Sequence, residues 1–66
     1  MKLEEVLLLA ANREKASYEF YTGLAAAHPA GRVKSLLEEI ASQELGHKQK
    51  VEIMYAEVAY PQTDGG

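Results

Sequence analysis

The sequence predicts an all-α fold, an antiparallel hairpin of two long helices, and three observations support this. Positions 3–27 contain no Pro, a single Gly and many strong helix formers. The HPAG segment at 28–31 interrupts this run, because Pro29 disfavours helix in the residue before it and a Gly suits a turn. Positions 32–59 again lack Pro and show helical spacing. A loop this short between two long helices predicts that they are antiparallel neighbours.

Length and composition limit what can stabilise such a hairpin. The chain has 66 residues and no Cys, so we expect one small domain, a hairpin over 1–59 followed by a polar tail over 60–66. Chains this short usually depend on disulfides, a metal or a partner subunit. Without Cys, disulfides, zinc–thiolate sites and iron–sulfur clusters are excluded. The chain must therefore be stabilised by metal binding through oxygen and nitrogen ligands, by oligomerisation, or by both.

Charge and hydropathy argue against two classes of partner. The formal net charge of −3 argues against nucleic acid. No apolar run approaches the ~20 residues that a membrane span needs. The first residues, MKLEEV, carry acids where a secretory signal has its apolar region. We therefore expect a cytoplasmic protein that binds neither nucleic acid nor membrane.

Each predicted helix carries one stripe of residues spaced by three or four positions, which is typical of a face that packs against another helix. In the first helix the stripe is Leu7, Ala10, Glu14, Ser17, Tyr21 and Leu24. In the second helix it is Val33, Leu37, Ile40, Glu44, His47, Val51, Met54 and Val58. Three ionisable residues, Glu14, Glu44 and His47, therefore occupy positions that the pattern assigns to the core.

These three residues are expected in one layer. The turn is centred between positions 29 and 30, so Glu14 lies opposite position 45, which Glu44 and His47 flank. The i, i+3 spacing of Glu44 and His47 directs both of these side chains to one helix face. Burying a carboxylate alone is costly, and no Lys or Arg lies on either stripe to pair with it. A divalent metal would satisfy the carboxylates, and this donor set suits iron, manganese or zinc.

The segment over 13–55 resembles one half of a rubrerythrin or ferritin-like domain. The family pattern is a Glu, a Tyr two turns later with small residues after it, and then a Glu-x-x-His motif. Glu14, Tyr21, Glu44 and His47 match this pattern. The resemblance implies that the hairpin dimerises into a ferritin-like four-helix bundle. The single-hairpin format is also similar to that of the encapsulated ferritins, whose di-iron site forms between two subunits.

The resemblance also implies the chemistry and the role of each residue. Two chains supply the four Glu and two His of a dimetal-carboxylate site, which holds two Fe and oxidises Fe(II) with O2 or peroxide. Glu44 of each chain would bridge the irons, His47 would be a terminal ligand and Glu14 would complete the shell. We assign Tyr21 to catalysis through a hydroxyl beside the ligands, with Tyr18 as the alternative donor. Since the chain lacks a Cys-bound iron of its own, an external electron donor is expected.

Two other functions are open from the residues alone. One is an adaptor hairpin that dimerises without metal, and the other is a structural zinc or manganese site without turnover. The residues over 48–50 are interpreted as a mostly solvated face. Four apolar residues fall outside both stripes and favour a homodimer or a larger even-numbered oligomer: Leu8, Leu9, Phe20 and Ile53.

Overall fold

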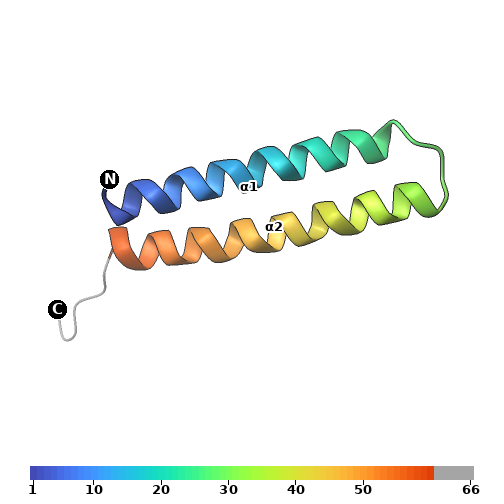
Figure 1. Cartoon of the computed structure of the whole chain (residues 1–66). Coiled ribbons are helices and arrows are strands. Elements are labelled where there is room, and N and C mark those ends of the chain that lie inside the picture. The colour runs from blue at the N-terminus through green and yellow to red at the C-terminus, as the bar shows by residue number, and fades with distance from the viewer. Residues whose placement is uncertain (61–66) are drawn as a thin grey trace.

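The computed structural model describes residues 1–60 and contains two α-helices that lie side by side (Figure 1). Helix α1 spans Leu3–Ala26 and helix α2 spans Arg32–Ala59. The turn lies at one end of the hairpin, and the N-terminus of α1 and the last turn of α2 lie together at the other. The prediction of an all-α chain with two helices is confirmed. The expected tail, apart from Tyr60, lies outside the described residues.

The turn is stabilised by groups that cap the end of α1. The last turn of α1 contains no basic residue, so its free carbonyls find donors elsewhere. His28 Nδ1 donates to the Leu24 carbonyl at 2.7 Å, and Lys34 Nζ reaches across from α2 to the Ala25 carbonyl at 2.9 Å. Gly31 caps the start of α2 with φ 158° and ψ −169°, a backbone conformation that residues other than glycine rarely adopt. The second helix therefore caps the first.

The two helices meet along a seam of small side chains. The buried hydrophobic residues are one leucine and three alanines, Leu7, Ala11, Ala25 and Ala41. We call the line along which these residues face the opposite helix the seam. Because alanine fills little volume, the opposite helix must supply longer side chains to complete the packing.

Three long side chains lie across the seam from these alanines. Lys34 donates a hydrogen bond to the Ala25 carbonyl. Tyr18 lines one groove together with Ala41. Lys48 lines a second groove together with Ala11. Ala11 and Ala25 are two heptads apart, as are the two lysines. The packing therefore alternates small and large residues between α1 and α2, which is how facing surfaces interdigitate.

The stripes that the sequence assigned to the core are only partly buried within one hairpin. Leu7 is buried and most of the other stripe residues are half-buried, but Val33 is 55% exposed and Met54 is 51% exposed. We call the surface made by these stripes and the residues that flank them the open face; its exposed large apolar residues are Leu3, Val6, Val33, Leu36 and Met54. The other buried positions, Ala11, Ala25 and Ala41, lie beside the stripes.

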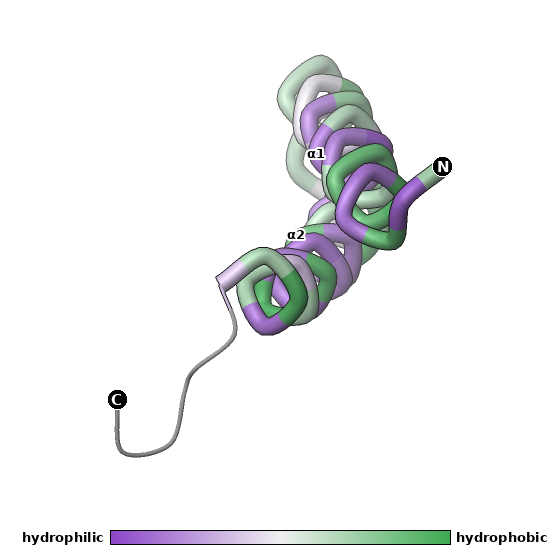
Figure 2. Tube along the Cα trace, turned by 90° about the vertical axis from the view of Figure 1, so that its left-hand side faces the viewer, coloured by the Kyte–Doolittle hydropathy of each residue, from purple (hydrophilic) through white to green (hydrophobic). Residues whose placement is uncertain are grey.

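The hairpin is thin and extended for its length. Its radius of gyration is 15.8 Å, whereas a compact domain of this length has about 11 Å. The shortest dimension is 11 Å, roughly the diameter of one helix. Viewed along the hairpin, both helices carry hydrophobic positions around their turns and not only where they meet (Figure 2). Neither described helix is long and apolar enough to cross a lipid bilayer.

Candidate metal site

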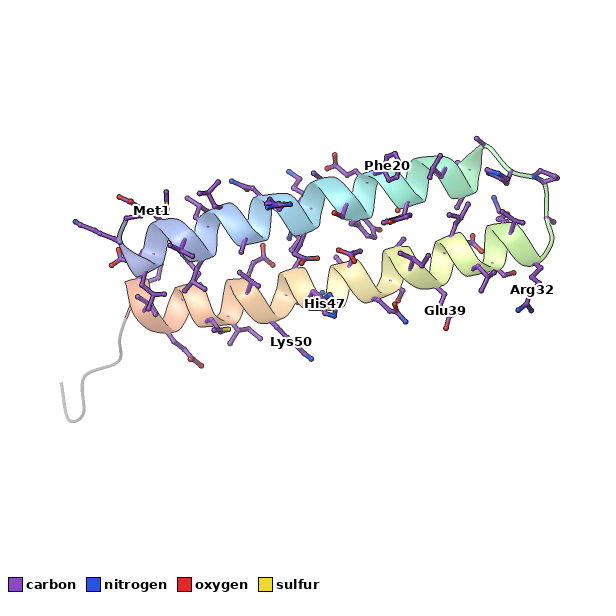
Figure 3. The ribbon with its side chains drawn as sticks, viewed as in Figure 1. Met1, Phe20, Arg32, Glu39, His47 and Lys50 are labelled. Carbon is purple, nitrogen blue, oxygen red and sulfur yellow. The ribbon has the colours of Figure 1, made fainter. Side chains whose placement is uncertain are left out.

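Glu14, Glu44 and His47 form a compact group at the middle of the hairpin. Each offers one ligand atom, and these atoms lie within 4.8 Å of one another. Glu14 comes from α1 and the other two residues come from α2, where His47 lies near mid-length (Figure 3). The two helices bring together residues that are about thirty positions apart, as expected for facing positions in a hairpin. The layer deduced from the spacing is therefore present.

Glu14 is partly buried between the helices. Its side chain is 29% exposed, and its Oε2 atom is buried without a hydrogen-bond donor. The nearest basic atom is His47 Nδ1 at 3.9 Å, too far for a hydrogen bond. A buried carboxylate oxygen without a donor is unfavourable, so it requires a proton or a cation. Glu14 thus presents an unsatisfied acceptor to the space between the helices.

The neighbouring Glu14 makes Glu44 hold its proton more tightly. Its pKa is raised above the ordinary value, first by a hydrogen bond with Glu14, then by loss of solvent and by repulsion from the Glu14 charge. The charge of His47 acts in the opposite direction. Two carboxylates cannot form a hydrogen bond with each other when both are ionised, so one of them must carry a proton, and the raised pKa of Glu44 assigns it to Glu44. A divalent cation would compete for the position of this proton.

The donor set fits a transition metal but does not complete its coordination. Two carboxylates and one imidazole are ligands that iron, manganese and zinc accept. His47 is 59% exposed on the open face, so its ring is accessible to an ion and to a partner. Three protein ligands are fewer than a carboxylate-bridged pair of metals requires, and a second copy of the chain would double the set. The arrangement fits half of a dimetal site.

The tyrosines take separate positions around this group. Tyr21 lies two turns beyond Glu14 on α1, half-buried, and its ring packs edge-on against Phe20 with centroids 5.2 Å apart. Phe20 points away from α2 (Figure 3). Tyr18 lines a groove together with Ala41 and therefore faces the seam.

Sequence reasoning missed one residue beside the site, Lys48. The face over 48–50 is mostly solvated, as interpreted, since Gln49 and Lys50 are exposed, but the side chain of Lys48 is only 22% exposed. Lys50, in contrast, points away from α1 (Figure 3). The available signal was the phase of the helix: Lys48 follows the buried Ala41 by one heptad and so faces the same neighbour.

Comparisons of the chain with protein-family models, curated proteins and solved structures found no match.

Proposed function

We propose that this chain is half of a ferritin-like di-iron protein that oxidises Fe(II) with O2 or peroxide, at a metal site formed between two copies. The observation that carries the proposal is the group of Glu14, Glu44 and His47, with ligand atoms within 4.8 Å on the open face. The sequence resemblance to rubrerythrins assigns the same three residues as ligands. The partner in this proposal is a second copy of the chain.

The exposed surface supports a second copy. Among the described residues, Leu3, Val33 and Met54 each leave more than half of their surface exposed. Large apolar side chains exposed together on one face are typical of an interaction surface. Apolar residues on both sides of the site layer, such as Val6 and Leu36, supply the interface with its hydrophobic area.

The position of the site along the helix supports one orientation of the copies. Glu14 lies 11 residues after the start of α1 at Leu3 and 12 residues before its end at Ala26. A two-fold axis through the site and perpendicular to the helices therefore superimposes the two hairpins over their whole length. The turns then lie at opposite ends of a four-helix bundle, and no apolar part of the open face is left uncovered.

In this assembly each residue has a defined task. Glu44 of both chains would bridge the two metals, His47 would bind one metal from each chain and Glu14 would complete each shell. Bound Fe(II) would supply the electrons that reduce O2 or peroxide. We assign Tyr21, two turns beyond Glu14 on α1, as the residue that would donate a proton or electron to the reaction. Turnover as a peroxidase would draw on an external electron donor, and we place the protein in the cytoplasm.

A two-step iron assay tests the proposal. Purified protein is loaded with Fe(II) without oxygen, and the appearance of Fe(III) is followed by absorbance after O2 or hydrogen peroxide is added. We expect oxidation by the wild type and loss of it in Glu44→Ala and His47→Ala, with retained helical circular dichroism. Glu39→Ala and Lys50→Ala are matched controls, because both residues lie on α2 and point away from α1 (Figure 3).

The outcomes distinguish this function from its two alternatives. Uptake of zinc or manganese without oxidation of iron would replace the proposal with a structural metal site. A dimer that takes up no metal would replace it with a metal-free adaptor hairpin, for which the exposed apolar residues of the open face are the supporting observation.

A further inference from the structure

Two grooves run along the side of the seam opposite the open face. One has a volume of about 390 Å³ and lies towards the turn, and the other, about 440 Å³, is lined by Ala11, Lys15 and Lys48 among others. Among the residues that the structure describes, Glu14, Glu44 and His47 line neither groove. A layer of protein therefore separates the second groove from the ligands.

Lys48 forms the α2 part of this layer. It lies four residues after Glu44, hence one turn further along the helix and ~40° around it. Its side chain is 22% exposed and lines the groove together with Ala11, which itself is 8% exposed. Ala11 lies one turn before Glu14 on α1. A long side chain on α2 thus crosses a small one on α1, immediately behind the two carboxylates.

The charged end of Lys48 is held away from the carboxylates. Its Nζ pairs with Glu52 Oε2 at 2.8 Å, one turn further along α2. The charges that act on Glu44 are those of Glu14 and His47. The part of Lys48 that covers the site is therefore its aliphatic stem, in the way that lysines bury their methylene groups and keep the ammonium in water.

We propose that Lys48 is a positioning residue of the metal site, whose stem closes the seam behind Glu14 and Glu44 and keeps the water of the groove from their oxygens. This inference rests on the proposed function for its metal, but not for its geometry. With the open face covered by a second copy, the groove side is the remaining short path from solvent to the ligands. The stem therefore controls how readily a bound ion is released through that path.

The chain contains a matched control at Lys34. It crosses the seam in the same manner at Ala25, two heptads away, and is also partly buried. Removing the Lys34 stem should loosen the hairpin near the turn without opening the metal site. A comparison of the two lysines thus separates closure of the site from general stability.

The test uses the full chain loaded with Fe(II) without oxygen and mixed with an excess of a ferrous chelator, the colour of the complex being followed by stopped flow. We expect Lys48→Ala to release iron about tenfold faster than wild type. Lys48→Met, which keeps the stem without the charge, and Lys34→Ala should stay within about twofold. If Lys48→Ala does not fold, Lys48→Val takes its place with an intermediate rate.

Three results would overturn the inference. They are a wild-type release rate in Lys48→Ala, an equal acceleration in Lys34→Ala, and a Lys48→Met rate as fast as that of Lys48→Ala. Hydrogen–deuterium exchange of the metal-free protein tests closure of the seam by the Lys48 stem independently of iron. Amides around Glu14 should exchange faster in Lys48→Ala than in Lys34→Ala. If the wild type binds no iron, the proposed function fails, and the exchange result alone then decides on the role of Lys48.

Discussion

Glu44 joins the stability of the metal-free chain to its proposed function. Its raised pKa means that the folded chain holds the proton more tightly than the unfolded chain does. The contribution of Glu44 to the free energy of unfolding is therefore fully present below the ordinary Glu pKa, and it is lost as pH rises through the raised pKa. Once Glu44 has lost its proton, its carboxylate and that of Glu14 repel each other in the absence of metal. A chain selected for stability alone would not keep this pair.

The variant Glu44→Gln separates these two effects. Its amide supplies a donor to Glu14 Oε2 at every pH, so the metal-free protein should unfold at a higher temperature than wild type at pH 7 and show a flatter pH dependence between pH 4 and 8. The same variant should bind no iron. Thermal unfolding followed by circular dichroism measures the first effect.

Glu39→Gln is the matched control for this variant, because Glu39 points away from α1 and should leave the pH profile of wild type unchanged (Figure 3). A wild-type protein whose stability rises from pH 4 to 8 through this site would contradict the account. So would a Glu44→Gln variant that is less stable than wild type at pH 7.

At the scale of the helices, close approach along the seam depends on alanine. Ala41 is 5% exposed and shares a groove with Tyr18, so its Cβ lies where a larger side chain would push the helices apart. Ala41→Leu should lower the free energy of unfolding by ~1–3 kcal/mol through overpacking. Ala56→Leu, at an exposed position of the same helix, should change it by less than ~0.5 kcal/mol. Urea titration at one protein concentration measures both, and equal effects would contradict the seam described here.

The helices and the site layer could be predicted from the sequence, but the seam could not. Helix formers and the HPAG segment define two helices, and counting from the turn brings Glu14 to the height of Glu44. The periodic pattern identifies the most apolar stripe of each helix without saying which neighbour covers it. Within one chain the helices pack through the alanines beside these stripes, because small residues permit close contact. The larger apolar residues of the open face stay exposed. The partial burial of Lys48 was missed because Lys48, like the alanines, faces the other helix from a position beside the stripes.

At the scale of the whole molecule, one hairpin leaves its open face uncovered. A layer one helix thick buries few residues. This matters because helices in proteins gain most of their stability from tertiary packing. The incomplete ligand group and the uncovered apolar residues occupy the same face. A single event, the association of two open faces, would therefore complete both the hydrophobic core and the metal site. Metal binding and association should strengthen each other, because each favours the same assembled state.

Native mass spectrometry of the protein, before and after addition of Fe(II) without oxygen, tests this central claim most directly. The account predicts even-numbered assemblies that take up two irons per pair of chains, and Glu44→Ala assemblies that take up none. A monomer with or without iron, or a dimer that takes up no iron, would contradict it.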